Sequence, residues 1–512
     1  MIALVRKLGA RAGGGTHRGL ITASVMLASV MQSLDTTIAN VALPHIQGSL
    51  SATQDQMTWV LTSYIVASAI MIPLSGWLAG QFGRKRVFLI SIALFTLASA
   101  LCGMAQTLPE LVAFRLLQGM GGAALIPLSQ AVLLDINPRE RHGRAMAIWG
   151  MGVVMGPILG PALGGWLTED YNWRWVFYIN VPIGILSFLG MLAFLAESER
   201  QRSRFDFFGF TTLSLAVGAL QMMLDRGQLK DWFSSTEIWI EAAVAGVALY
   251  LFIVHTLTSD RPFVNPALFR DRNFVTGNVF IFIVGLVLFA TLALMPPLLQ
   301  DLLKYPVITT GLVTAPRGIG TLLAMMIVGR LVGRMDVRLI IAFGFLLTAW
   351  SLWQMTGFSL LMDSSLIIWS GVIQGIGTGF AYVPLAAVAF ATLAPRLRNE
   401  GTAVFNLMRN IGSSIGISVV QIMLTRNTQI VHSTLAEHVT PYSHFLPSQI
   451  GPDGWTSAQG LAALNHRVTE QAAMIAYNDD FQMMLMLTLC VIPLVVVLRD
   501  VRARNGAPVA ID

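Results

Sequence analysis

A carboxylate interrupts the first apolar stretch of the chain. The run from about Gly19 to Pro44 is long enough to cross a bilayer as a helix, and it contains Asp35. At 1.5 Å per residue, Asp35 lies roughly 24 Å along such a helix, in its outer part. A charge inside a membrane helix costs about 3 kcal/mol on insertion scales and usually faces the bundle interior or a wet cavity. We therefore interpret Asp35 as a site that binds a proton or a cation. The alternative is an acid that only reaches the aqueous rim.

Three arginines also lie within apolar runs, at Arg115, Arg317 and Arg409. A buried guanidinium needs a partner or water. Arg115 is the strongest candidate, because a cation near Asp35 would favour its carboxylate form and so control proton binding. For Arg317 and Arg409 two readings stay open: they line a cavity, or they extend from a helix end to the membrane surface.

Polar and aromatic residues elsewhere in apolar runs are candidates for a substrate cavity, which should be mostly apolar with a few polar anchors. Gln32 and Thr36 can share a helix face with Asp35, and Asn40 lies further along the same helix. Each candidate could equally be a packing residue. The candidate cavity residues are Gln32, Asn40, Trp59, Tyr64, Gln118, Arg317, Tyr382, Asn406 and Arg409.

The sequence lacks the common catalytic and metal-binding motifs. It has no HExxH pair, no phosphate loop ending in Gly-Lys-Ser/Thr and no paired cysteines, and Cys102 and Cys490 both lie in apolar runs. We therefore expect no enzyme activity, no metal and no cofactor. Energy for any transport would come from a proton gradient rather than from ATP.

The composition is that of a membrane protein. Of the 512 residues, 55% are hydrophobic and only 12% are charged, about half the charged share of a soluble protein. No small-residue cleavage pattern follows the first apolar run, so it is an uncleaved helix. Fourteen stretches have the length of a span, which predicts an all-α polytopic protein. They are 19–43, 57–79, 87–106, 110–134, 143–167, 175–196, 207–224, 237–257, 274–297, 308–332, 338–358, 365–392, 401–425 and 480–498.

Basic residues fall mainly in alternate loops. Most of the 33 Lys and Arg residues lie in the N-terminal segment, in every second loop and in the C-terminal tail. The remaining loops hold only Arg174, Arg226, Lys230, Lys304, Arg426 and Arg467. Because positive loops stay in the cytoplasm, this pattern predicts both termini there and an even number of spans.

The chain also repeats itself. Leu117–Gly121 and Ile126–Leu128 recur as Ile373–Gly377 and Val383–Leu385, which places Gln118 and Gln374 256 residues apart. This offset predicts two six-helix halves, a 6 + 2 + 6 arrangement typical of transporters with a midplane site. The expected parts are a cytoplasmic segment 1–18, a first half 19–196, a two-helix insert 197–272, a second half 273–498 and a tail 499–512.

The segment 426–479 in the second half is unusually long for a loop. It holds Pro441, Pro447, Gly451, Pro452 and Gly454, and helical periodicity returns from Thr456 to Tyr477. Long loops are usually functional or disordered. It would either dock a partner outside the membrane or serve as a linker.

Five motifs together resemble the major facilitator superfamily. Within it they are similar to the fourteen-helix drug:proton antiporter branch, and with the long outer segment they look closest to EmrB-type inner-membrane pumps. The match covers nearly the whole chain. The motifs are Leu34–Pro44, Gly76–Arg86, Arg115–Gly122, Gly152–Gly165 and Trp173–Gly184.

The resemblance implies proton-coupled efflux of amphipathic or hydrophobic compounds across a bacterial inner membrane. It implies coupling roles for Asp35 and Arg115, and partnership with a periplasmic adaptor protein and an outer-membrane channel. It also implies a conformational latch carried by Gly76, Gly83 and Arg84, although Gly80 stands where an acidic residue is usual. The alternatives are export of one physiological solute, such as a fatty acid or a siderophore, uncoupled facilitation, and a sensor without transport.

Glycines in the fifth expected helix recur every fourth position, at Gly152, Gly156, Gly160 and Gly164, with Gly165 beside them. Such a stripe lets another helix approach closely. Pro157 and Pro161 remove backbone donors and bend the helix. We expect a smooth, kinked surface between the two halves that suits rocking. Tight packing alone is the alternative.

Overall fold

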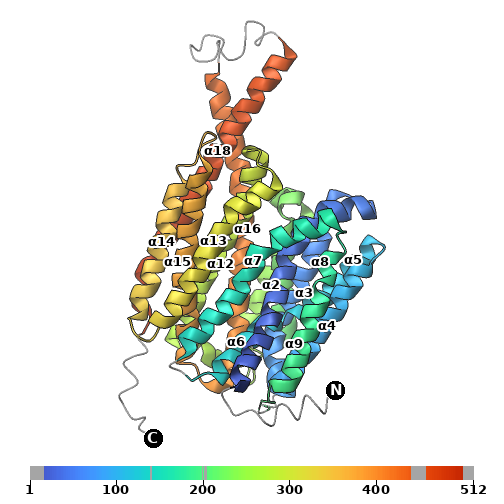
Figure 1. The fold of residues 1–512 in the computed structure, drawn as a ribbon, viewed down its shortest axis with the longest axis vertical. Helices are drawn as coiled ribbons and strands as arrows, with labels where there is room; N and C mark the ends of the chain where they lie inside the picture. The colour runs from blue at the N-terminus through green and yellow to red at the C-terminus, as the bar shows by residue number, and fades with distance from the viewer. Residues whose placement is uncertain (1–15, 139–140, 199, 201–203, 440–456, 500–512) are drawn as a thin grey trace.

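The structure is a computed structural model that describes residues 16–138, 141–198, 200, 204–439 and 457–499. These residues form a bundle of long helices from which two helices project at one end (Figure 1). Their only β pairing is an isolated bridge between Val332 and Met335. The all-α prediction is confirmed.

The first half contains six crossings. The segments on either side of Ala123 and Ala124 form one crossing, and α8 and α9 form another. Polar residues set the starts of two helices: Thr53 with Gln56, and Thr107 with Glu110, form capping boxes that satisfy free backbone N–H groups. The helices are α2 (Thr16–Leu50), α3 (Gln54–Phe82), α4 (Arg84–Met104), α5 (Leu108–Gly122), α6 (Leu125–Ile136), α7 (His142–Asp170), α8 (Trp175–Tyr178) and α9 (Asn180–Phe194).

The insert and the second half follow in the predicted order. Short helical turns η2 (Gln228–Lys230), η3 (Trp232–Ser234), η4 (Pro266–Arg270) and η6 (Pro395–Leu397) lie in the connections. The insert is α10 (Phe207–Arg226) and α11 (Thr236–Thr258). The second half is α12 (Arg272–Pro297) with η5 (Leu298–Leu302), α13 (Val307–Leu331), α14 (Val337–Met355), α15 (Ser364–Ala391), α16 (Arg398–His438), and α18 (Ala458–Val491) with η7 (Ile492–Val497).

The number of crossings fits the predicted fourteen. Twelve helical segments of the described chain are long and apolar enough to span a membrane. The helix α7 is a thirteenth span if the two parts on either side of its 40° bend, between Gly160 and Ala162, are counted as one. The 35-residue α2 is also long enough to cross but is less apolar than these twelve, and with it the described helices fit fourteen crossings. In Figure 1, α2 begins and η7 ends at the same end of the bundle, as an even number requires. We call it the termini end, and the opposite one the hairpin end.

The prediction that the loop begins at residue 426 was wrong, because residues 426–438 are helical. The helix α16 continues to His438 and α18 begins at Ala458, and the two project together at the hairpin end (Figure 1). His432 and Asn465 are hydrogen-bonded across the pair at 3.0 Å. The predicted periodicity from Thr456 to Tyr477 is confirmed from Ala458 onward. The proline and glycine positions 441–454 lie outside the described residues.

The glycine stripe of α7 does not face the other half, contrary to the expectation. Cβ atoms added at the stripe would collide with α2, which belongs to the same half: Gly156 with Ser33, Gly160 with Thr37 and Gly164 with Ile38. Gly152 likewise faces Met26 on α2, and Gly165 has no neighbour within 4 Å. The stripe therefore seats α2 closely against α7.

Hydrogen bonds from α2 side chains also hold this contact between α2 and α7. The hydroxyl of Ser33 donates a hydrogen bond to the carbonyl of Val153. That carbonyl lies four residues before Pro157, which has no N–H to offer it. Thr37 adds a second bond, to the Gly156 carbonyl at 3.0 Å. Side chains of α2 thus donate hydrogen bonds to backbone carbonyls of α7, close to the proline that interrupts its backbone hydrogen bonds.

The contact between the halves uses other positions of α7. A Cβ at Gly143 would meet Val332, a Cβ at Gly329 would meet Ala147, and a Cβ at Gly318 would meet Ile158. Because α7 belongs to the first half and α13 to the second, these close approaches hold the two halves together along α7 and α13.

The insert also touches both halves. On α10, Asp225 accepts a hydrogen bond from Thr62 of α3. The Gln221 side chain and the Leu224 carbonyl accept hydrogen bonds from Ser414 and Ser418 of α16, at 2.9 and 2.8 Å. The part of α10 near the hairpin end is therefore fixed between the first and second halves.

Candidate functional site

Asp35 of α2 and Arg115 of α5 form a buried ion pair. The Arg115 Nη1 atom lies 2.7 Å from Asp35 Oδ2, and the side chains are 1% and 0% exposed. The prediction that an arginine lies beside the acid is confirmed. A charged hydrogen bond of this length, shielded from water, is a strong contact.

The other carboxylate oxygen of Asp35 has two amide donors. Gln118 Nε2 and Asn180 Nδ2 donate to Oδ1 at 2.7 and 2.8 Å. Asn180 also donates to the Ser99 hydroxyl at 3.0 Å. Asp35 is therefore held by three donors from α5 and α9.

Arg115 is equally well enclosed. Its Nε donates to the Val60 carbonyl at 3.2 Å, and its Nη1 donates to the Gln118 amide oxygen at 2.8 Å. The guanidinium carbon lies 4.3 Å from the centre of the Tyr64 ring and 5.7 Å from that of Phe177. Cation–π contacts of this kind stabilise a guanidinium away from water.

In this arrangement, Asp35 cannot bind a proton without a change in the structure around it. The ion pair is neutral overall, and a proton on Asp35 would leave Arg115 as a lone buried charge, which is strongly unfavourable. Protonation therefore requires the pair to separate, water to enter, or another negative group to approach Arg115. A site of this kind can convert a bound proton into a change of helix packing.

Two members of the site were missed from the sequence. Asn180 was noted only within the Trp173–Gly184 resemblance, and Ser99 was not noted at all. The available signal was a single amide in an otherwise apolar stretch of α9, directly after Ile179. A spanning helix carries such a group at a cost, so it needs a partner.

The structure separates the candidate cavity residues of the first half. Gln32 and Tyr64 are buried, Tyr64 against Arg115, and Gln118 contacts Asp35 directly. Trp59 instead packs under Arg226 of α10, 4.8 Å from ring centre to guanidinium carbon, and Asn40 is exposed. Trp59 and Asn40 therefore make no described contact with Asp35.

Candidates from the second half form a separate group against the first half. Arg409 Nη1 donates to the Tyr382 hydroxyl at 2.9 Å, and the Tyr382 ring stacks on Trp149 of α7 at 5.8 Å. Asn406 Nδ2 donates to Gln130 Oε1 of α6 at 2.9 Å. This group lies between α6, α7, α15 and α16, so it joins the halves.

Arg317 and Arg409 carry buried charges that no acid compensates in the described chain. They are 9% and 7% exposed, and neither forms an ion pair there. The contact of Arg317 is a 3.4 Å hydrogen bond from Nη2 to the Leu288 carbonyl. The second half thus presents two buried cations, both from positions predicted to line a cavity.

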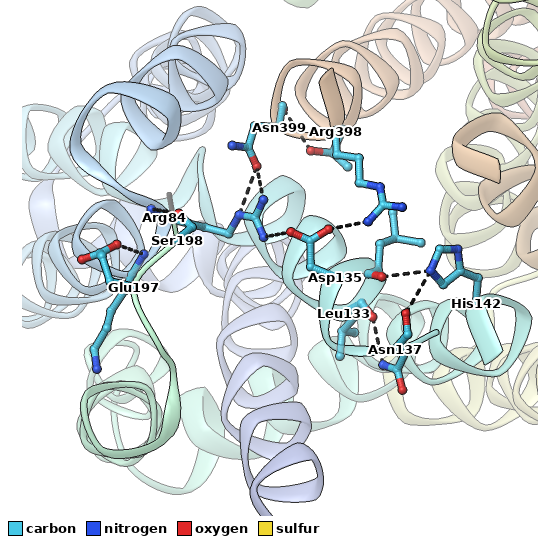
Figure 2. Close-up of polar contacts among 12 residues, drawn as sticks. Arg84, Leu133, Asp135, Asn137, His142, Glu197, Ser198, Arg398 and Asn399 are labelled. Carbon is cyan, nitrogen blue, oxygen red and sulfur yellow. Dashed lines mark hydrogen bonds and ion pairs between the residues drawn. The ribbon is translucent and has the colours of Figure 1, made fainter. Parts of the chain in front are cut away.

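A polar clamp joins the halves at the termini end (Figure 2). Arg84, at the start of α4, donates to Asp135 of α6 at 2.5 Å and to the Asn399 amide oxygen of α16 at 2.7 and 3.0 Å. Arg398 of α16 donates to the other Asp135 oxygen at 2.6 Å. Asp135 therefore binds one arginine from each half.

Arg84, expected to act in a latch with neighbouring helix ends, does pair with such ends, but through a different acid. Asp135, and not position 80, supplies the acid, and Asp135, Arg398 and Asn399 were all missed from the sequence. A Cβ atom at Gly76 would lie 3.1 Å from the backbone of Asn399, so the absence of a side chain lets α3 approach α16 closely. Gly83 has φ of 92°, and a Cβ there would meet the Glu197 carboxylate. Both glycines are needed where they stand.

The fold and the buried charges are those of a polytopic membrane transport protein. The family model described as Major Facilitator Superfamily matches residues 25–417, and the chain belongs to this superfamily. It is 38% identical over 475 residues to the multidrug export protein EmrB of Escherichia coli (strain K12), covering 92% of this chain and 93% of that protein. It is also 38% identical over 486 residues to the fatty acid resistance protein FarB of Neisseria gonorrhoeae, covering 94% and 96%.

Solved structures agree on the fold. The proton:xylose symporter XylE superposes with a TM-score of 0.61 at 14% identity, covering 96% of this chain and 99% of that one. The human organic anion transporter MFSD10 (TETRAN) superposes with a TM-score of 0.58 at 13% identity, covering 92% and 99%. At such identities the likeness concerns the fold alone.

Proposed function

We propose that this protein exports amphipathic and hydrophobic organic compounds across a bacterial inner membrane in exchange for protons. The observation that carries the proposal is the buried Asp35–Arg115 pair, held by Gln118 and Asn180. Its setting supports the proposal, since the chain is 38% identical to a multidrug export protein over nearly its full length.

In the proposed cycle, a proton from outside neutralises Asp35 and separates it from Arg115. The halves then rock, and the proton leaves to the cytoplasm. Coupling arises because proton and cargo favour different conformations of the same protein. The basic loops support assigning the termini end to the cytoplasm. With the Arg84–Asp135–Arg398 clamp formed, the described conformation is then closed toward the cytoplasm.

The test is substrate accumulation in proteoliposomes with an imposed pH gradient. Asp35→Asn should reduce gradient-driven accumulation to the level of protein-free liposomes. Asp363→Asn is the matched control, because Asp363 is an exposed acid that caps α15 and Asn caps a helix equally well. Accumulation by Asp35→Asn equal to that of the parent would remove Asp35 as the coupling site.

A second candidate cargo is an anionic amphiphile such as a fatty acid. Two observations favour it: the buried cations Arg317 and Arg409, which no described acid compensates, and the likeness to a fatty acid resistance protein. A carboxylate head group would pair with one of these arginines. Arg409→Gln should then reduce efflux of fatty acids more than tenfold and leave efflux of cationic dyes within twofold. Equal effects on both cargo classes would reject the anionic role.

We further propose that the projecting α16–α18 pair binds a periplasmic adaptor protein, which in turn engages an outer-membrane channel. The length of the projection supports this, because both helices continue beyond their apolar stretches to His438 and from Ala458. Replacing residues 430–467 by a short Gly-Ser linker removes the projecting parts of both helices and leaves their apolar stretches in place. Co-purification of the adaptor should be lost while the variant stays monodisperse, and retained co-purification would reject the proposal.

A further inference from the structure

A second acid is buried in the other half, at the outer end of the last span. Asp480 of α18 is 0% exposed, and neither of its carboxyl oxygens has a hydrogen-bond partner. This contrasts with Asp35, whose oxygens receive one ion pair and two amide bonds.

The surroundings of Asp480 are apolar. The next residue, Phe481, packs edge-to-face on Phe358 at 5.7 Å, and Met484 on the following turn is fully buried. Asn478 is turned away from the acid and donates to the Phe358 carbonyl at 3.0 Å. No polar group from these contacts reaches the carboxyl.

The titratable groups near Asp480 are acids and a phenol. On its own helix these are Tyr477 and Asp479, and on η5 Asp301 lies near Tyr477. Asp479 receives the amide of Asn427 from α16 at 3.4 Å. No arginine, lysine or histidine of the described chain acts on Asp480. An ionised carboxylate in such a place would have neither a cation nor a donor, so the group takes up a proton instead.

A surface hollow leads toward this acid. It lies between α16 and α18 at the base of the projecting pair, with a volume of about 380 Å³, and is lined by Leu424, Thr425, Thr428, Gln429, Ala473 and Tyr477. Tyr477 precedes Asp480 by three residues, so the two side chains share a face of α18. Tyr477 thus both lines the hollow and neighbours the buried acid.

We propose that Asp480 is a second proton-binding carboxyl, located in the second half and opening to the outer hollow past Tyr477. In the described conformation it carries its proton. When Tyr477 moves and water enters, the carboxyl O–H bond breaks, the proton passes to water in the hollow, and a hydrated carboxylate remains. This site does not depend on Asp35 or on the identity of the cargo.

The test is infrared spectroscopy of the purified full-length protein in lipid, through the C=O stretch of protonated carboxyls. At neutral pH the wild-type protein should show such a band, and Asp480→Asn should lack it. Asp479→Asn is the matched control and should keep the band, because Asp479 is partly exposed and hydrogen-bonded to Asn427. Identical spectra for wild type and Asp480→Asn would overturn the proposal. Since no transport is measured, failure here is distinct from failure of proton-coupled export.

A second variant tests the path. Tyr477→Ala should admit water from the hollow, so that the Asp480 band disappears at a lower pH than in wild type. Tyr477→Phe keeps the ring and should leave the band unchanged. A band in Tyr477→Ala that follows the wild-type pH dependence would show that the hollow does not lead to Asp480. Size-exclusion profiles report that each variant is folded.

Discussion

The two halves carry the same glutamine at the same place, but only in the first half does this glutamine donate to an acid. In the first half Gln118 donates to Asp35, and in the second half Gln374 donates to the Thr291 hydroxyl at 3.1 Å. Thr291 follows Asp35 by the same 256 residues that separate the two glutamines. The polar contact between the first and fourth helices of each half has therefore been kept, while its acid has been replaced.

The two halves also differ in the helix that supplies the arginine. At the 256-residue offset, Arg115 corresponds to Gly371, and a Cβ there would lie 3.5 Å from the Arg317 Cβ. The second half thus brings a guanidinium from α13 to the region where the first half uses α5. A cavity of about 20 Å³ beside Gln374, enough for one water molecule, occupies a further part of this region. In the first half the shared glutamine therefore contacts an ion pair, whereas in the second half it contacts a neutral hydroxyl and the nearby arginine has no acid.

The largest expected effect comes from breaking the charged site. Arg115→Met leaves Asp35 buried without its cation, and removing one partner of a buried pair costs about 3–5 kcal/mol. The midpoint of thermal unfolding in detergent should fall strongly. The double variant Asp35→Asn, Arg115→Met is neutral and should recover most of the loss. A double variant no more stable than Arg115→Met would show that the charges do not act as a pair.

Next in size is the attempt to make the second half resemble the first. Thr291→Asp, made together with Arg317→Met so that no neighbouring arginine can pair with it, places a carboxylate beside Gln374, and the free energy of unfolding should fall by about 3 kcal/mol relative to Arg317→Met alone. Thermal unfolding at neutral pH and at pH 5 measures this. Because a proton removes the charge, the loss should shrink at the lower pH. A loss that does not change with pH would indicate a steric cause.

Thr291→Val tests the neutral contact itself. The change removes the acceptor of the Gln374 amide and should cost about 1 kcal/mol. Proton-driven accumulation in proteoliposomes should stay within twofold of the parent, unlike that of Asp35→Asn. A loss of coupling in Thr291→Val would mean that the second half also takes part in proton transfer.

The smallest effect concerns two glycines, one in each half, that share a backbone conformation. Gly83 and Gly333 both adopt positive φ, 92° and 97°, and each precedes an arginine. Arg84 joins the halves through Asp135, which is about one-third exposed, whereas the exposed Arg334 forms no described ion pair. Arg84→Ala should weaken closure at the termini end by about 1 kcal/mol, a fivefold shift in population.

Spin labels on α6 and α16 would measure that shift as a change in distance distribution. Arg334→Ala is the control and should leave the distribution unchanged. If both variants open the termini end equally, the clamp is not what holds the halves together there.

The features predictable from the sequence were local. The fourteen spans were placed within a few residues of the observed helices, because span length and apolarity are properties of short stretches. The exception was α16 and α18, whose polar residues continue the helices past their apolar segments. The Asp35–Arg115 contact could be anticipated because isolated charges in such stretches need each other.

What the sequence could not provide was the choice of partner. The spacing of Gly156 and Gly160 correctly indicates a close helix contact, but it does not say that α2 of the same half is the neighbour. Asp135 and Arg398 are 263 residues apart and meet only because the halves fold against each other. Asn180 stands between Ile179 and Val181 in the chain, and the acid to which it donates lies 145 residues away.

The hydroxyl of Ser33 has a consequence for how α2 can travel. It donates a hydrogen bond to the Val153 carbonyl, to which Pro157 has no N–H to offer. Ser33 lies two residues before Asp35 on α2. Sliding α2 along α7 would separate Ser33 from that carbonyl, which would then need another donor. The hydrogen bond therefore favours the observed register of α2 against α7, and with it the present position of Asp35 along α7.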